Sequence, residues 1–187
     1  MPIEFTQLLL PALVSAVLVF IASSLVHMVI KWHSSDYRKL PNEDEVRAVL
    51  NRGGATAGQY VTPHCKDSKS MEDPVQQQKM KDGPIAVLWL RQPGPMKLGP
   101  FLGKWFAYTF VLSLAAGYVA SITCMTGAPY ETVFRIVSVA AWLGYAGMGP
   151  TYGIWKGQPW KAIAKETVDG LVYALLTAGA FGWLWPG

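Results

Sequence analysis

Four long apolar stretches constrain this chain more than any other feature of its sequence. They run from about Leu8 to Ile30, from Trp105 to Cys124, from Thr132 to Met148 and from Thr167 to Trp185. A helix needs about 20 mostly apolar residues to cross a bilayer. The third stretch is the shortest and carries Arg135 near its start. We therefore predict an all-α membrane protein with four transmembrane helices.

Charge supports the same class of protein. Only 15% of the residues are charged, whereas soluble domains have about 25%. The first stretch contains no Asp, Glu, Lys or Arg, and no basic side chain precedes it. A signal peptide has a basic start and a shorter apolar core, so we expect a retained anchor. The net charge of +4 comes from basic residues beside the apolar stretches, so no nucleic-acid partner is expected.

Lysine and arginine set the predicted orientation. Most of them lie between the first and second stretches, and three more lie between the third and fourth, whereas Arg135 alone falls on the other side. Lys and Arg favour the cytoplasmic side, so both termini should face outward. The expected division is transmembrane helix 1 (1–31), a small cytoplasmic α+β insertion (32–104) and transmembrane helices 2–4 (105–187).

Tryptophans gather at the ends of the predicted spans. Their amphipathic rings suit the headgroup layer, so we expect interface anchors rather than a stack for a cofactor. The expected partner is the lipid bilayer, with anionic lipids at the basic cytoplasmic face. The six anchors are Trp32, Trp105, Trp155, Trp160, Trp183 and Trp185.

The insertion carries local folding signals. A capping box at Asn42 and Glu45 predicts a helix over Glu43–Arg52, and Asp73 before a proline predicts a second helix over 74–81. Two β-prone runs should pair as a ribbon, parallel or antiparallel, at 59–63 and 85–90.

One titratable side chain, His27, lies well inside an apolar stretch, which makes it a functional candidate. We expect an interfacial or helix-packing role for His27; the alternative is that it ligates a haem or chlorin or relays a proton. His33, His64 and Cys65 share its predicted side of the membrane and are candidate zinc ligands, although their spacing matches no known site. We predict no catalytic residue, cofactor or metal. Cys124 and Cys65 lie on opposite predicted sides, so no disulfide is expected.

Two oppositely charged pairs stand four residues apart. Glu131 with Arg135, and Lys165 with Asp169, occupy neighbouring positions on one helix face, so each pair is expected to form an ion pair. Arg135 could instead bind an anionic ligand or a lipid headgroup.

Small residues recur along three of the spans. Such spacing lets helix backbones approach closely, which is the main device for helix packing in lipid. We expect packing within one chain, or against another membrane subunit or a second copy. The positions are Ser113, Gly117, Ser121, Ala140, Gly144, Gly170, Ala174, Ala178 and Gly182.

The chain resembles a family of bacterial four-helix inner-membrane proteins of about this length. The segments that carry the resemblance include SLVHMVIKWHSSDYRKLPNEDEV, GQYVTPH, LGKWFAYT, YETVFR, YGIWKGQPW and DGLVYALLTAGAFGWLWP. The resemblance implies a multi-pass protein of the bacterial inner membrane and names no activity.

The expected function is non-catalytic, as an accessory, scaffolding or assembly component of a membrane complex. The first alternative is a small transporter or a binding protein for a quinone or lipid, with a pocket lined by Trp142, Tyr145 and Tyr173. The second is a membrane enzyme that uses His27, His33 or His64.

Overall fold

The computed structural model describes residues 1–187, which are mostly helical and contain one two-stranded sheet. The chain divides into two units. The bundle unit consists of Met1–Tyr37, Lys97–Ile154 and Gln158–Gly187, and the loop unit consists of Arg38–Met96 and Trp155–Gly157.

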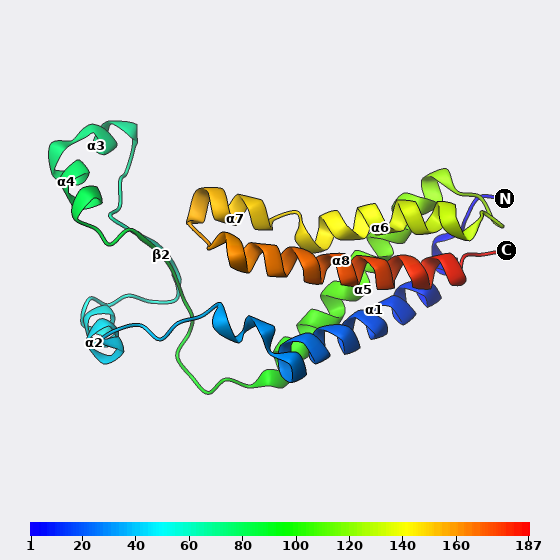
Figure 1. Ribbon diagram of the computed structural model, residues 1–187, viewed down its shortest axis with the longest axis horizontal. Helices are drawn as coiled ribbons and strands as arrows, with labels where there is room; N and C mark the ends of the chain where they lie inside the picture. The colour runs from blue at the N-terminus through cyan, green and yellow to red at the C-terminus, as the bar shows by residue number, and fades with distance from the viewer. The chain divides into compact units, whose positions relative to one another are not determined.

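Four long helices form the bundle unit: α1 (Leu9–Ser24), α5 (Leu98–Thr123), α6 (Tyr130–Ala146) and α8 (Trp160–Trp183). Helix α8 packs against α6 and α1, and α5 packs against the same two helices (Figure 1). Shorter elements extend them: η1 (Phe5–Leu8), the π-helical turn η2 (Leu25–Ile30), η3 (Trp32–Ser35) and α7 (Gly149–Lys156).

Both chain termini lie at one end of the bundle (Figure 1). The amino group of Met1 donates to Thr126 Oγ1 at 2.8 Å, and the backbone N–H of Gly127 donates to the carbonyl of Pro186 at 2.7 Å. The turn between α5 and α6 therefore ties the first and last residues together.

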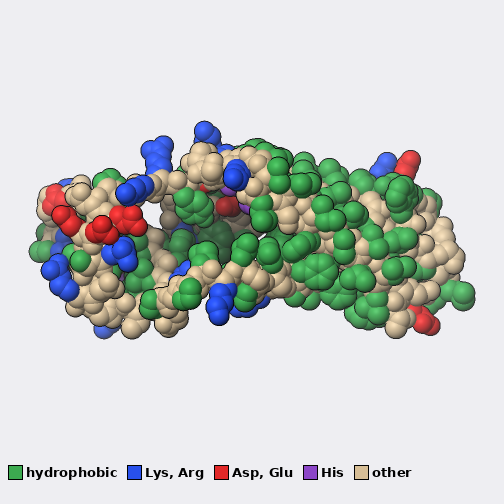
Figure 2. Space-filling view, turned by 90° about the horizontal axis from the view of Figure 1, so that it is seen from below, with side chains coloured by type: hydrophobic (Ala, Val, Ile, Leu, Met, Phe, Trp, Pro, Cys, Tyr) green, Lys and Arg blue, Asp and Glu red, His purple; other side chains and the backbone are tan.

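Three helical segments are long and apolar enough to cross a membrane: Phe5–Ile30, Leu98–Thr123 and Tyr130–Lys156. Helix α8 does not meet that measure, because its first half carries Lys161, Lys165, Glu166 and Asp169. Figure 2 shows hydrophobic side chains over most of the visible surface of the bundle unit, with few charges among them. Such a surface suits a lipid environment.

The bundle core depends on small residues. A Cβ atom at Gly117 would lie 2.2 Å from the ring of Phe181, and one at Gly182 would lie 2.6 Å from the ring of Tyr130. Ser113 hydrogen bonds to Ser15 of α1 at 2.9 Å, with both hydroxyls buried. The remaining small residues predicted to pack the helices differ in burial. Gly170, Ala174 and Ala178 are buried, Ser121 and Ala140 are half-buried, and Gly144 is exposed.

The loop unit contains the predicted helices and ribbon. Its elements are α2 (Glu43–Arg52), β1 (Gly58–Thr62), α3 (Ser68–Glu72), α4 (Pro74–Asp82) and β2 (Ala86–Leu90). The bounds of α2 are those predicted, and β1 pairs with β2 in antiparallel register. Asp73 caps α4 by accepting from the N–H of Val75 at 2.7 Å. The short helix α3 was not predicted.

The capping box predicted at Asn42 is wrong. Asn42 adopts a left-handed conformation with φ 53°, and its side chain makes no cap hydrogen bond. A capping side chain usually requires extended backbone at that position. The acidic first turn of α2 and the following glycine therefore define this helix without the cap.

Candidate functional site

Local backbone geometry brings two histidines of the bundle unit face to face. Helix α1 widens into the π-helical turn η2, which carries His27, and Lys31 then adopts a left-handed conformation with φ 55°. π-Turns are rare and often mark functional sites. The chain reverses at Lys31, so that the ring of His33 in η3 stacks on that of His27, with centroids 4.8 Å apart.

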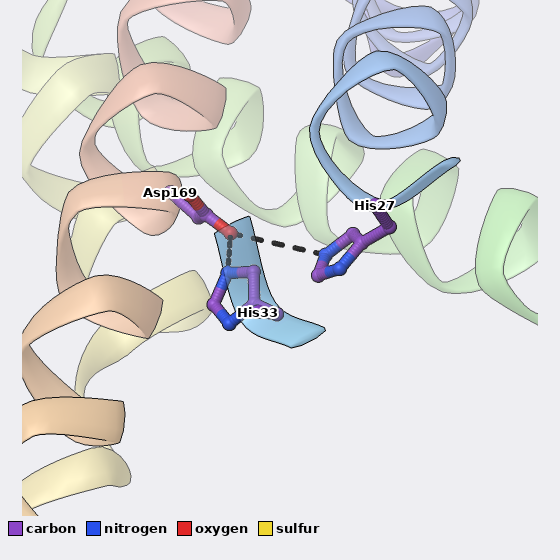
Figure 3. A group of neighbouring side chains, drawn as sticks. All are labelled: His27, His33 and Asp169. Carbon is purple, nitrogen blue, oxygen red and sulfur yellow. Dashed lines mark hydrogen bonds and ion pairs between the residues drawn. The ribbon is translucent and has the colours of Figure 1, made fainter. Parts of the chain in front are cut away.

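A carboxylate from α8 completes this group, which we call the His–Asp cluster: His27, His33 and Asp169 (Figure 3). Asp169 Oδ2 lies 2.7 Å from His33 Nε2 and 3.8 Å from His27 Nε2. The side chain of Asp169 is 8% exposed and that of His33 is 15% exposed, whereas that of His27 is 52% exposed. The cluster is therefore sheltered on the side of α8 and open on the side of His27.

Asp36 and Lys165 surround the cluster. Asp36 Oδ2 lies 2.7 Å from His33 Nδ1, so His33 stands between two carboxylates. Lys165 Nζ donates to Asp36 Oδ1 at 2.5 Å, to the carbonyl of Trp32 at 2.6 Å and to Ser35 Oγ at 2.9 Å. The Lys165 hydrogen bond lowers the pKa of Asp36 below its ordinary value, against the opposing effect of burial, and His33 lowers it further.

The predicted pair between Lys165 and Asp169 is wrong, since Lys165 instead binds Asp36 and the η3 turn, and Asp169 binds His33. Both contacts join residues more than 120 positions apart in sequence, so helix spacing could not reveal them. The available signal was Asp169 itself, the last charged residue of α8 before its apolar half begins. The pair between Glu131 and Arg135 is confirmed at 3.9 Å.

The remaining sequence candidates fall elsewhere. His64 and Cys65 belong to the loop unit, and both cysteines of the chain are free, as predicted. Trp105 donates from its indole to Ser23, and Trp185 donates to the carbonyl of Met125. The other four predicted anchors are exposed, namely Trp32, Trp155, Trp160 and Trp183.

An apolar groove of about 360 Å³ adjoins His27. It lies between the end of α1 and the start of α5, and its lining includes Met28, Leu98, Phe101 and Trp105. Chemically, the cluster can hold a proton between two carboxylates or offer two imidazole nitrogens and one carboxylate oxygen to a cation.

No protein-family model, curated protein or solved structure matches this chain.

Proposed function

We propose that this chain is a four-span membrane protein and a non-catalytic accessory or assembly component of a larger membrane complex. Helix α8 is the fourth span. At about 1.5 Å per residue its 24 residues reach about 36 Å, enough for a bilayer core of about 30 Å. An even number of crossings agrees with the termini lying at one end of the bundle.

The observation that supports the accessory role is that the loop unit has no buried core. None of the residues in Arg38–Met96 is buried. Folded units of this size normally bury a sizeable share of their apolar surface, and exposed apolar side chains in number mark contact surfaces. We therefore infer a membrane partner that covers these side chains. The exposed large apolar residues within Arg38–Met96 are Leu40, Val46, Val49, Tyr60, Val61, Met71, Val75, Ile85, Trp89 and Met96.

The alternative of a binding protein with a pocket inside the bundle receives less support. Tyr145 and Tyr173 pack edge to face against each other at 5.6 Å, and the ring of Trp105 lies 6.1 Å from that of Tyr173. Aromatic rings thus fill the space between α5, α6 and α8 where that pocket was expected, and Trp142 is exposed.

Cysteine labelling tests the topology. In a background of Cys65→Ser and Cys124→Ser, we expect an impermeant maleimide outside intact cells to label Gly187→Cys. Lys79→Cys should react only after permeabilisation, because basic flanks favour the cytoplasmic side for residues 32–104. Both positions are exposed, so their reactivity reports the compartment. Labelling of both from the same side would contradict a four-span topology with the insertion inside.

Site-specific photo-crosslinking in cells tests the accessory role. A photoreactive side chain at Val49 or Trp89, which are 58% and 51% exposed, is expected to give one dominant adduct of defined mass. Lys66 is exposed and polar and serves as the control position, where no dominant adduct should form. The same diffuse products at all three positions would count against a partner on this surface, and an adduct with twice the chain mass would identify a second copy.

A further inference from the structure

We propose that the His–Asp cluster binds one divalent transition-metal ion of the zinc type through His27, His33 and Asp169. Each residue offers one ligand atom, and these atoms all lie within 4.8 Å of one another. Figure 3 shows the side chains converging from η2, from η3 and from α8. Two imidazoles and one carboxylate form a known set of zinc ligands that leaves a further coordination position open.

The distances fit a metal centre. A tetrahedral ion about 2.0 Å from each ligand atom separates those atoms by about 3.3 Å. Asp169 Oδ2 lies 2.7 Å from one imidazole nitrogen and 3.8 Å from the other, on either side of that value. The third separation, between the two imidazole nitrogens, is at most 4.8 Å, so a shared ion requires half-exposed His27 to move toward His33 and Asp169 by no more than about 1.5 Å.

Asp36 supplies the outer contact that metal-binding histidines usually have. It accepts a hydrogen bond from His33 Nδ1 at 2.7 Å, which directs the Nε2 lone pair of the neutral ring toward Asp169 and the ion. Lys165 in turn fixes the Asp36 carboxylate from the opposite side. Asp36 is thus a positioning residue, and Lys165 holds it in place.

Ligand type and exposure narrow the class of ion. Imidazole nitrogens select zinc and neighbouring transition metals, whereas magnesium and calcium prefer oxygen ligands throughout. Asp169 is nearly buried, which keeps its carboxylate from bulk water, while half-exposed His27 gives an ion a route in. This inference does not depend on the accessory role, because the loop unit contributes no ligand.

Metal binding to the full chain in detergent tests the proposal. After removal of metal by a chelator, titration with Zn²⁺ is expected to show one equivalent, and Co²⁺ should give the visible absorption of a tetrahedral centre. Asp169→Asn keeps the shape but loses the charge, and it should weaken Zn²⁺ binding by more than about 100-fold, beyond what loss of an outer contact costs. Asp36→Asn should keep one equivalent and weaken binding about 10- to 100-fold.

The double variant His64→Gln/Cys65→Ser is the matched control, because it removes the other two candidate ligands and should leave binding unchanged. If Asp169→Asn does not fold, His27→Gln serves as the test variant. His27 is half exposed, and its substitution leaves the contact between His33 and Asp169 in place. No stoichiometric Zn²⁺ in the parent chain, or equal affinity in the parent, Asp169→Asn and His27→Gln, would overturn the proposal.

Discussion

Phe181→Ala is expected to destabilise the bundle by about 2 to 3 kcal/mol. Phe181 is fully buried in the core and its ring lies directly on Gly117 of α5. In lipid, the transfer term largely cancels, because an unpacked helix still exposes the ring to an apolar solvent. The cavity term remains, at about 24 cal/mol per Å³ for a void of roughly 100 Å³. Equilibrium unfolding in mixed detergent micelles measures the loss.

The neighbouring glycine gives this prediction an internal check. Gly117→Ala alone should destabilise, since its Cβ would lie 2.2 Å from the buried ring. Combined with Phe181→Ala, the same substitution should cost little, because the ring that it meets is gone. Gly103→Ala is the control on α5, where an added Cβ meets nothing within 4 Å. Additive effects of the two substitutions would show that the ring and the glycine do not form one packing unit.

The parts of the fold that depend on neighbouring residues could be predicted from the sequence. The bounds of α2 follow from three acidic residues in its first turn and from Gly53 after its end, all within a dozen positions. The antiparallel ribbon follows from two β-prone runs, although its direction was open. Asn42 failed as a cap because its backbone adopts a left-handed conformation, which residue spacing does not report.

The candidate site could be predicted only in part, for the same physical reason. His27 was identified because a titratable group is costly inside an apolar stretch. His33 was named only together with His64 and Cys65 as a candidate zinc ligand, and Asp169 was not a site candidate. The contact between His27 and His33 depends on a left-handed Lys31, and Asp169 lies on a helix 136 positions after His33. Helix spacing predicted an ion pair between Lys165 and Asp169. Lys165 instead donates hydrogen bonds to the Trp32 carbonyl and to the Asp36 carboxylate, at the η3 turn.

Lys165→Met is expected to release the η3 turn from α8 while the bundle stays folded. The variant removes the donor to the Trp32 carbonyl, to Ser35 and to Asp36, and keeps most of the side-chain volume. Loss of even one charge-assisted hydrogen bond, about 1.5 to 3 kcal/mol, corresponds to roughly 10- to 100-fold more frequent opening. Hydrogen exchange of the Ser34 and Asp36 amides, which donate within this segment, should accelerate by that factor.

Lys161→Met is the matched control for this effect. Lys161 lies one turn earlier on α8 and is exposed, so its loss should leave exchange in η3 unchanged. Amides in the middle of α8 should stay protected in both variants, because their protection depends on the packing of Phe181 and the small residues rather than on the turn. If Lys165→Met leaves η3 as protected as the parent chain, then His33 and Asp169 hold the turn without the lysine. In that case Asp36 keeps its position against His33 without Lys165. The Zn²⁺ affinities of Asp36→Asn and Asp169→Asn then compare the contributions of the two carboxylates to metal binding.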